Sequence, residues 1–146
     1  MHLAQINIAE MKEPEGHPSM SGFFDNIDFI NDIAETSSGF VWRLKDETGN
    51  ATSFNPFDNN MLIVNMSVWA SKDHLFDFVY KSMHLEILKR KNEWFHKMKK
   101  MHFALWYINE GQYPDLAEAK KRLEYINVHG PTPNAFNFRT SFSEEE

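Results

Sequence analysis

Met61-Leu-Ile-Val-Asn-Met-Ser-Val-Trp69 is the stretch of sequence that decides the fold. It is rich in β-branched residues, and a loop containing proline and asparagine, residues 55–60, leads into it. This composition is typical of a β-strand whose side chains pack on both neighbouring strands. We therefore predict a strand at residues 61–69 and place it at the centre of a sheet.

The segments on either side of this strand alternate between strands and amphipathic helices. Alternating or β-branched runs predict further strands at residues 2–8, 40–44 and 101–109, and a short hairpin arm at 51–54. Apolar residues at three-and-four spacing predict helices at 18–37, at 71–95 with a break near 82, and at 114–130. This order matches the ferredoxin-like split βαβ plan, an α+β fold with a four-stranded antiparallel sheet and here an extra C-terminal helix.

The bulk composition predicts one domain. The chain has 146 residues, of which 42% are hydrophobic and 14% aromatic, enough to form one hydrophobic core. We expect a domain over residues 1–142 and a mobile acidic tail at 143–146. Phe136, Phe138 and Phe142 are expected to pack on the body of this domain. The absence of cysteine excludes disulfides, thiolate metal sites and cysteine nucleophiles.

The charge disfavours two classes of partner. A net charge of −6 argues against binding nucleic acid or an anionic membrane surface. No apolar run approaches the length of a membrane span, and we expect a cytoplasmic protein. Residues 81–100 nevertheless carry seven basic and two acidic side chains. This stretch is either a solvated helix face or the rim of an anion-binding site.

The strands also predict that two copies of the chain pair. A four-stranded sheet covered by helices on one side leaves its other side bare, and here both sides of the strands are apolar or aromatic. An exposed patch of that kind is unusual for a monomer. We therefore expect a homodimer that pairs through its sheets.

The amino-acid sequence of these segments resembles that of the DUF3291 family over nearly the whole chain. The segments that carry the resemblance are Leu3-Ala-Gln-Ile-Asn7, Gly39-Phe-Val-Trp-Arg43-Leu, Gly49-Asn-Ala-Thr, Val64-Asn-Met-Ser-Val-Trp69, Phe78-Val-Tyr80-Lys-Ser-Met-His84, Glu93-Trp94-Phe, Leu105-Trp-Tyr, and Gly130-Pro131 followed by Ala135-Phe-Asn-Phe-Arg139. The resemblance implies a dimeric α+β barrel. That superfamily includes antibiotic-biosynthesis-type monooxygenases, haem-handling enzymes and spheroidene monooxygenase, and the segment around His84 is most similar to the last of these.

His84 and Tyr80 are the first two candidate catalytic residues. His84 follows Tyr80 by four residues, which on one continuous helix places an imidazole beside a phenol. A histidine there could ligate haem iron, act as a general base or hydrogen-bond a ligand. The alternative is a packed or half-exposed helix histidine without a catalytic role.

Four polar residues lie within otherwise apolar strands: Asn7, Arg43, Asn65 and Ser67. Polar groups persist in an interior only when they are hydrogen-bonded. They could line one ligand cavity, or form a polar network at the interface of the sheets or at an exposed edge. Arg43 is the third candidate catalytic residue, because an interior guanidinium needs a carboxylate from the protein or from a ligand.

The four tryptophans could wall a flat apolar ligand, or could simply be core residues. They are Trp42, Trp69, Trp94 and Trp106. Lys89, Arg90 and Lys91 near His84 would suit a hydrophobic ligand that carries a carboxylate.

Two functions follow from these candidates. The first is an oxygenase-like or haem-associated enzyme acting on a small hydrophobic molecule held between helices and sheet. The second is a non-catalytic homodimer that binds or senses such a molecule. The cofactor stays open: haem is possible with His84 as its ligand, and so is a cofactor-free site. The sequence holds no His-Glu-x-x-His zinc motif, P-loop, Gly-x-Gly-x-x-Gly or Gly-x-Ser-x-Gly pattern.

Overall fold

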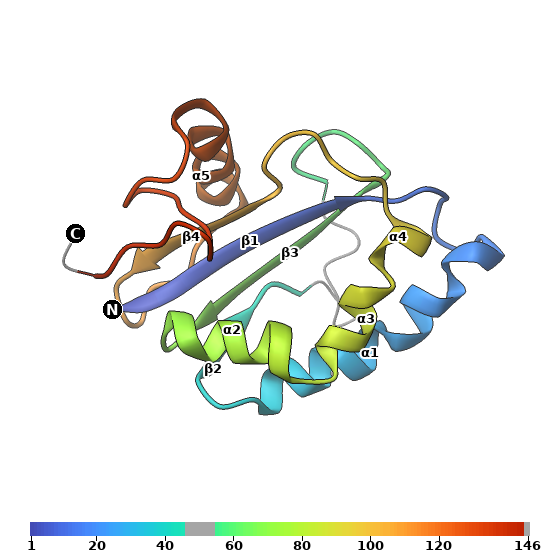
Figure 1. The fold of residues 1–146 in the computed structure, drawn as a ribbon, viewed down its shortest axis with the longest axis horizontal. Helices are drawn as coiled ribbons and strands as arrows, with labels where there is room; N and C mark the ends of the chain where they lie inside the picture. Colours follow the sequence, from blue (N-terminus) through green and yellow to red (C-terminus); the bar gives the residue numbers. More distant parts are fainter. Residues whose placement is uncertain (46–54, 145–146) are drawn as a thin grey trace.

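Four antiparallel strands form one sheet in the order β2-β3-β1-β4 (Figure 1). The structure is a computed structural model that describes residues 1–45 and 55–144. The strands are β1 (His2–Glu10), β2 (Phe40–Arg43), β3 (Leu62–Trp69) and β4 (Phe103–Ile108). The predicted α+β class, the split βαβ order and the central place of β3 are confirmed. The hairpin arm expected at 51–54 and the end of the acidic tail, 145–146, lie outside the described residues.

The register of the strands separates the two faces of the sheet. β1 pairs with β3 from Leu3 opposite Trp69 to Glu10 opposite Leu62, and with β4 along its other edge. Because side chains alternate along a strand, Leu3 and Trp69 face one side of the sheet, and their neighbours Ala4 and Val68 face the other.

One side of the sheet is covered by α1 (Ser21–Thr36), α2 (Lys72–Lys81), α3 (His84–Lys89) and α4 (Lys91–Trp94), as Figure 1 shows. A single 3₁₀ turn, η1 (Pro18–Met20), precedes α1. Leu3, Trp69 and Leu105 of the sheet pack on this side against Ala34 of α1 and Leu75 of α2. We call this surface of the sheet the helix-facing side.

The break predicted near residue 82 separates α2 from α3. Ser71 caps the start of α2 by accepting a hydrogen bond from the His74 amide at 3.2 Å. At the other end, Ser82 is extended, with φ −113° and ψ −176°, and its Oγ accepts from the His84 amide at 3.1 Å. Ser82 therefore ends one helix and positions the first residue of the next.

The second side of the sheet is covered by α5 (Leu116–His129) of the same chain (Figure 1). Asp115 caps this helix by accepting from the Glu118 amide at 2.7 Å, and Gly130 ends it with φ +73°. Ala119, Leu123 and Ile126 of α5 pack on the sheet residues of this side, which are 0–5% exposed: Ala4, Ile6, Ile8, Val64, Met66, Val68, Ala104 and Trp106. The prediction that this face is bare is therefore wrong. The sequence predicted the C-terminal helix but did not show that it packs on this face. Pairing of two copies stays a prediction without this support.

The tail after α5 packs on the body, as expected. Phe136 is fully buried and exchanges two backbone hydrogen bonds with Leu105 of β4, at 2.7 and 2.9 Å. The Phe138 ring lies 5.3 Å from that of Phe103, and the Phe142 ring lies 5.8 Å from that of Phe136. The tail thereby extends the outer edge of the sheet and closes one edge of the helix layer.

Within the described residues, no helix is long and apolar enough to cross a membrane.

Candidate functional site

Polar side chains form two adjacent rows on the helix-facing side of the sheet. In one row Arg43 of β2 lies opposite Ser67 of β3, which lies opposite Gln5 of β1. In the next row Asn65 lies opposite Asn7. Residues that lie opposite each other on antiparallel strands share a face, so all five side chains belong to the same side. We call these five residues the polar rows.

Gln5 holds the centre of the polar rows through its amide nitrogen. Gln5 Nε2 donates to Asn65 Oδ1 at 2.6 Å and to Ser67 Oγ at 2.8 Å. Ser67 Oγ also accepts from the indole Nε1 of Trp69 at 2.9 Å. Gln5 is 3% exposed and Ser67 6% exposed, and this network gives both side chains hydrogen-bond partners in a low-dielectric position where an unpaired polar group would be costly.

Asn7 and Asn65 are exposed, whereas the other three residues of the polar rows are buried or half-buried. The two asparagines point to the side of the sheet that the helices cover, so the helix layer leaves the sheet open above this pair. The opening places two amides on an otherwise apolar surface formed by residues such as Ile63 and Phe103. This is the arrangement expected of a ligand site that is mostly apolar and has a few polar groups.

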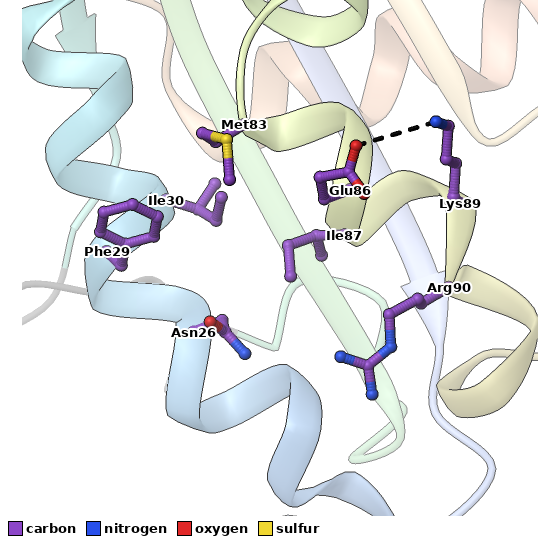
Figure 2. Close-up of a pocket in the computed structure, with 8 residues that line it drawn as sticks. All are labelled: Asn26, Phe29, Ile30, Met83, Glu86, Ile87, Lys89 and Arg90. Atoms are coloured by element: carbon purple, nitrogen blue, oxygen red, sulfur yellow. Dashed lines mark ion pairs between the residues drawn. The ribbon is translucent and has the colours of Figure 1, made fainter.

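A groove of about 310 Å³ runs between α1 and α3 (Figure 2). It is lined by Asn26, Phe29, Ile30, Met83, Glu86, Ile87, Lys89 and Arg90. Figure 2 shows Ile30 and Ile87 pointing toward each other across it. Ile87 also packs in the same cluster as Ile63 of β3, two residues from Asn65, which ties the groove to the helix-facing side of the sheet.

The carboxylate that Arg43 requires comes from the protein. Arg43 Nε donates to Glu35 Oε1 of α1 at 2.9 Å, and the Arg43 side chain is only 10% exposed. Glu35 also lies 3.8 Å from Lys45 Nζ, so one carboxylate serves two cations. This group connects the end of α1 to the edge of the polar rows.

His84 is the first residue of α3 and is half-buried. Burial lowers the pKa of its imidazole below the ordinary value, and a hydrogen bond with the Val79 carbonyl opposes this effect only in part. Since a carbonyl can only accept, His84 Nδ1 carries the hydrogen in that 3.1 Å contact. The neutral imidazole therefore has an unprotonated Nε2, which is the atom that a general base or a metal ligand uses.

Two aromatic rings connect His84 to the polar rows. The His84 ring lies 4.9 Å from the ring of Phe78, and Phe78 stacks on Trp69 at 5.1 Å. Trp69 in turn donates to Ser67. The imidazole and the sheet network thus belong to one packed unit between α2, α3 and β3.

The model of the family described as "Domain of unknown function (DUF3291)" matches residues 2–146. The chain belongs to the DUF3291 family. No protein of curated function matches it.

Two solved structures resemble this DUF3291 chain in fold. They are SnoaB, a cofactor-independent oxygenase from Streptomyces nogalater, and an asparagine-to-alanine variant of the same protein. Each has 13% sequence identity and a TM-score of 0.48, and each match covers 78% of this chain and 98% of the other. The likeness is one of fold.

Tyr80 does not lie beside His84 in the DUF3291 chain. The two residues belong to different helices, because Ser82 interrupts the helix between them. The Tyr80 ring packs on Phe76 at 4.7 Å and on Phe138 at 5.9 Å, and the residue is 40% exposed. The expected pair of imidazole and phenol on one helical face is therefore wrong.

The four tryptophans are also distributed and do not wall one cavity. Trp69 lies on the helix-facing side, whereas Trp42 and Trp106 pack on the side that α5 covers. Trp94 lies with Phe23 and Met20 at the α4 end of the helix layer. Only Trp69 adjoins the polar rows, and the strand parity of the other two sheet residues explains their separation.

The sequence did not single out three residues of this site: Gln5, Glu35 and Phe78. Gln5 shares its strand parity with Asn7, which was a usable signal, while the roles of Glu35 and Phe78 depend on long-range packing. Among the described residues no group of three His, Asp or Glu side chains could hold a metal ion. If haem were bound, the unprotonated Nε2 of His84 would be the atom that holds its iron.

Proposed function

We propose that the chain is an oxygenase-like enzyme that holds a small hydrophobic molecule between its helices and the helix-facing side of the sheet. The observation that carries this proposal is the exposed pair Asn7 and Asn65, which lies on the covered side of the sheet beside the buried hydrogen-bonded network of Gln5 and Ser67. The polar rows orient the ligand, and the apolar residues around them bind its body.

His84 acts as the general base in this proposal. A neutral imidazole can take a proton from an acidic O–H or C–H of the ligand when that group comes within hydrogen-bond reach of Nε2. The resulting ligand anion is a stronger reductant than its neutral parent. The ligand itself then supplies the electrons for dioxygen, and no redox cofactor is needed.

Oxygen consumption tests the catalytic part of the proposal. A panel of naphthols and related enolisable aromatics is first screened by thermal shift, and binders are then tested in an oxygen electrode. We expect oxygen uptake with the wild type and none above background with His84→Gln, at unchanged ligand affinity. Binding without oxygen uptake by the wild type would contradict catalysis and favour the non-catalytic binder.

Haem addition tests the haem version separately. If haem is the cofactor, the purified chain acquires a stoichiometric Soret band that His84→Ala loses. No band in the wild type would rule that version out and leave the cofactor-free version standing.

A further inference from the structure

The Gln5 amide fixes the direction of the hydrogen bonds in the polar rows. An amide NH₂ has two hydrogens, and Gln5 Nε2 gives one to Asn65 Oδ1 and one to Ser67 Oγ. The Asn65 carbonyl oxygen is therefore turned toward Gln5. The other end of the Asn65 amide, its Nδ2 with two donor hydrogens, is the part left for a ligand at this exposed position.

The hydrogen bonds of Ser67 also leave a donor for a ligand. A hydroxyl oxygen has two acceptor lone pairs and one hydrogen. Ser67 Oγ already accepts from Gln5 and from Trp69, so only its hydrogen remains available. Within residues 1–45 and 55–144 this hydrogen has no protein acceptor, and Ser67 is thus a donor that lacks a partner.

The charge beside these donors is positive. Arg43, which lies opposite Ser67, shares the single carboxylate of Glu35 with Lys45. The three side chains together carry a net charge of +1. Glu35 binds Arg43 at Nε, and in the part of the chain that the structure describes the two Nη groups bond no protein acceptor. They are the groups with which a guanidinium clamps an oxyanion.

We propose that the ligand of this site presents an oxyanion, a carboxylate or an ionised phenol or enol, to Asn65, Ser67 and Arg43, and that Gln5 is the positioning residue that turns the donors of Asn65 and Ser67 toward it. This inference rests on the proposed function and names its substrate class. An oxyanion carries acceptor atoms only, which matches the donors that Asn65, Ser67 and Arg43 offer.

Binding of matched aromatic probes tests the substrate class. The probes are 2-naphthoate, its neutral analogue 2-naphthamide, and 2-naphthol, each measured by calorimetry with the full chain. We expect 2-naphthoate to bind about tenfold or more tightly than 2-naphthamide, since hydrogen bonds to charged groups are the stronger ones. For 2-naphthol, absorbance against pH reports whether the bound phenol ionises at lower pH than the free one.

These arms separate the two sources of an oxyanion. Preference for 2-naphthoate indicates a carboxylate ligand, and a lowered ionisation pH of bound 2-naphthol indicates a phenolate. If naphthamide and naphthol bind without either effect, the inference is overturned while the hydrophobic site survives. If none of the probes binds, the proposed function fails with it.

Gln5→Glu tests the positioning role. A carboxylate at this position only accepts, so Asn65 and Ser67 must turn their hydrogens inward and the site loses these two donors. We expect the preference for 2-naphthoate over 2-naphthamide to fall by about tenfold or more. Gln112→Glu adds the same charge at an exposed turn residue and should leave the preference unchanged.

Gln5→Met keeps this test decisive if Gln5→Glu does not fold. It is neutral and similar in length, and it releases Asn65 and Ser67 to adopt either orientation. We expect it to weaken the anion preference while binding of 2-naphthamide stays near the wild-type value. An anion preference retained in full by both variants, or weakened equally by Gln112→Glu, would overturn the positioning role.

Discussion

Ser67 is the residue on which the sheet network converges. It accepts from the Gln5 amide at 2.8 Å and from the Trp69 indole at 2.9 Å, and all three side chains are buried. A hydroxyl at the centre of three strands is therefore the shared acceptor for two interior donors. Removal of such an acceptor leaves donors that water cannot reach, which costs more than the net value of one hydrogen bond.

Ser67→Ala should lower the free energy of unfolding by about 1–3 kcal/mol, because the Trp69 indole loses its acceptor and the Gln5 amide loses one of its two acceptors. Urea denaturation followed by tryptophan fluorescence measures this change. Ser38→Ala is the matched control, since Ser38 is exposed in the turn before β2. If the two variants lose the same stability, Ser67 is not the centre of the network.

His84 makes stability depend on pH. Its pKa in the folded state is lowered from 6.5 by burial, so the unfolded chain binds a proton more readily than the folded one. Its contribution is therefore fully present above about pH 6.5 and is lost as the pH falls from the unfolded pKa toward the folded one.

The difference between wild type and His84→Gln isolates this contribution from the other six histidines. We expect the unfolding free energy of the wild type to fall more steeply between pH 7.5 and pH 5.5 than that of the variant. Urea denaturation at several pH values measures both slopes. Equal slopes would mean that His84 titrates alike in the folded and unfolded chain.

At the scale of elements, the helix break and α5 show what the sequence could and could not predict. The break at Ser82 was expected from the apolar pattern, and the helix predicted at 114–130 matches α5, which Asp115 caps and Gly130 ends. An amphipathic stripe shows that a helix buries one face but not which surface receives it. The sheet face that α5 covers therefore looked bare.

The candidate site was likewise only partly predictable from the sequence. Asn7, Arg43, Asn65 and Ser67 were predicted as a group, and their strand register brings them together. The tryptophans were grouped by residue type, and Trp106 lies on the opposite side because its neighbour Leu105 is the residue opposite Gln5. Register is a long-range property, so no local pattern could assign these faces.

Ile126→Ala should lower the free energy of unfolding by about 2–5 kcal/mol, because this fully buried side chain joins α5 to the sheet. Val128→Ala lies two residues away on the same helix, is 76% exposed, and should change stability by less than about 0.5 kcal/mol. Thermal and urea denaturation compare the two. Similar small losses would show that α5 does not cover the sheet in solution.

At the scale of the whole molecule, pairing of two copies stays a prediction. The side of the sheet assigned to pairing holds α5, and half-buried apolar residues such as Trp42, Leu44 and Phe57 lie at the border of that core. Sedimentation velocity over a range of concentrations measures the assembly directly. We expect a dimer, and a monomer at all concentrations would contradict it.

The tail after α5 contacts the start of β1 and the end of β4. The Met1 amino group lies 3.6 Å from a Glu144 carboxylate, and Tyr107 donates to the Phe142 carbonyl at 2.8 Å. Phe136 joins the edge of β4 and packs in the same cluster as Leu3 of β1. The tail is therefore part of the core that holds the helix layer to the sheet, and it should unfold together with them.

Phe136→Ala tests whether the tail is part of this core, because it empties a fully buried ring position between the tail, β1 and β4. We expect a loss of about 3–5 kcal/mol in the free energy of unfolding. Phe29→Ala, at a 51% exposed position on α1, is the matched control and should lose far less.

Circular dichroism and tryptophan fluorescence should give coincident unfolding curves for the wild type, because tail, sheet and helices share one core. Proteolysis that removes the tail of the wild type before the body unfolds would contradict a single cooperative unit.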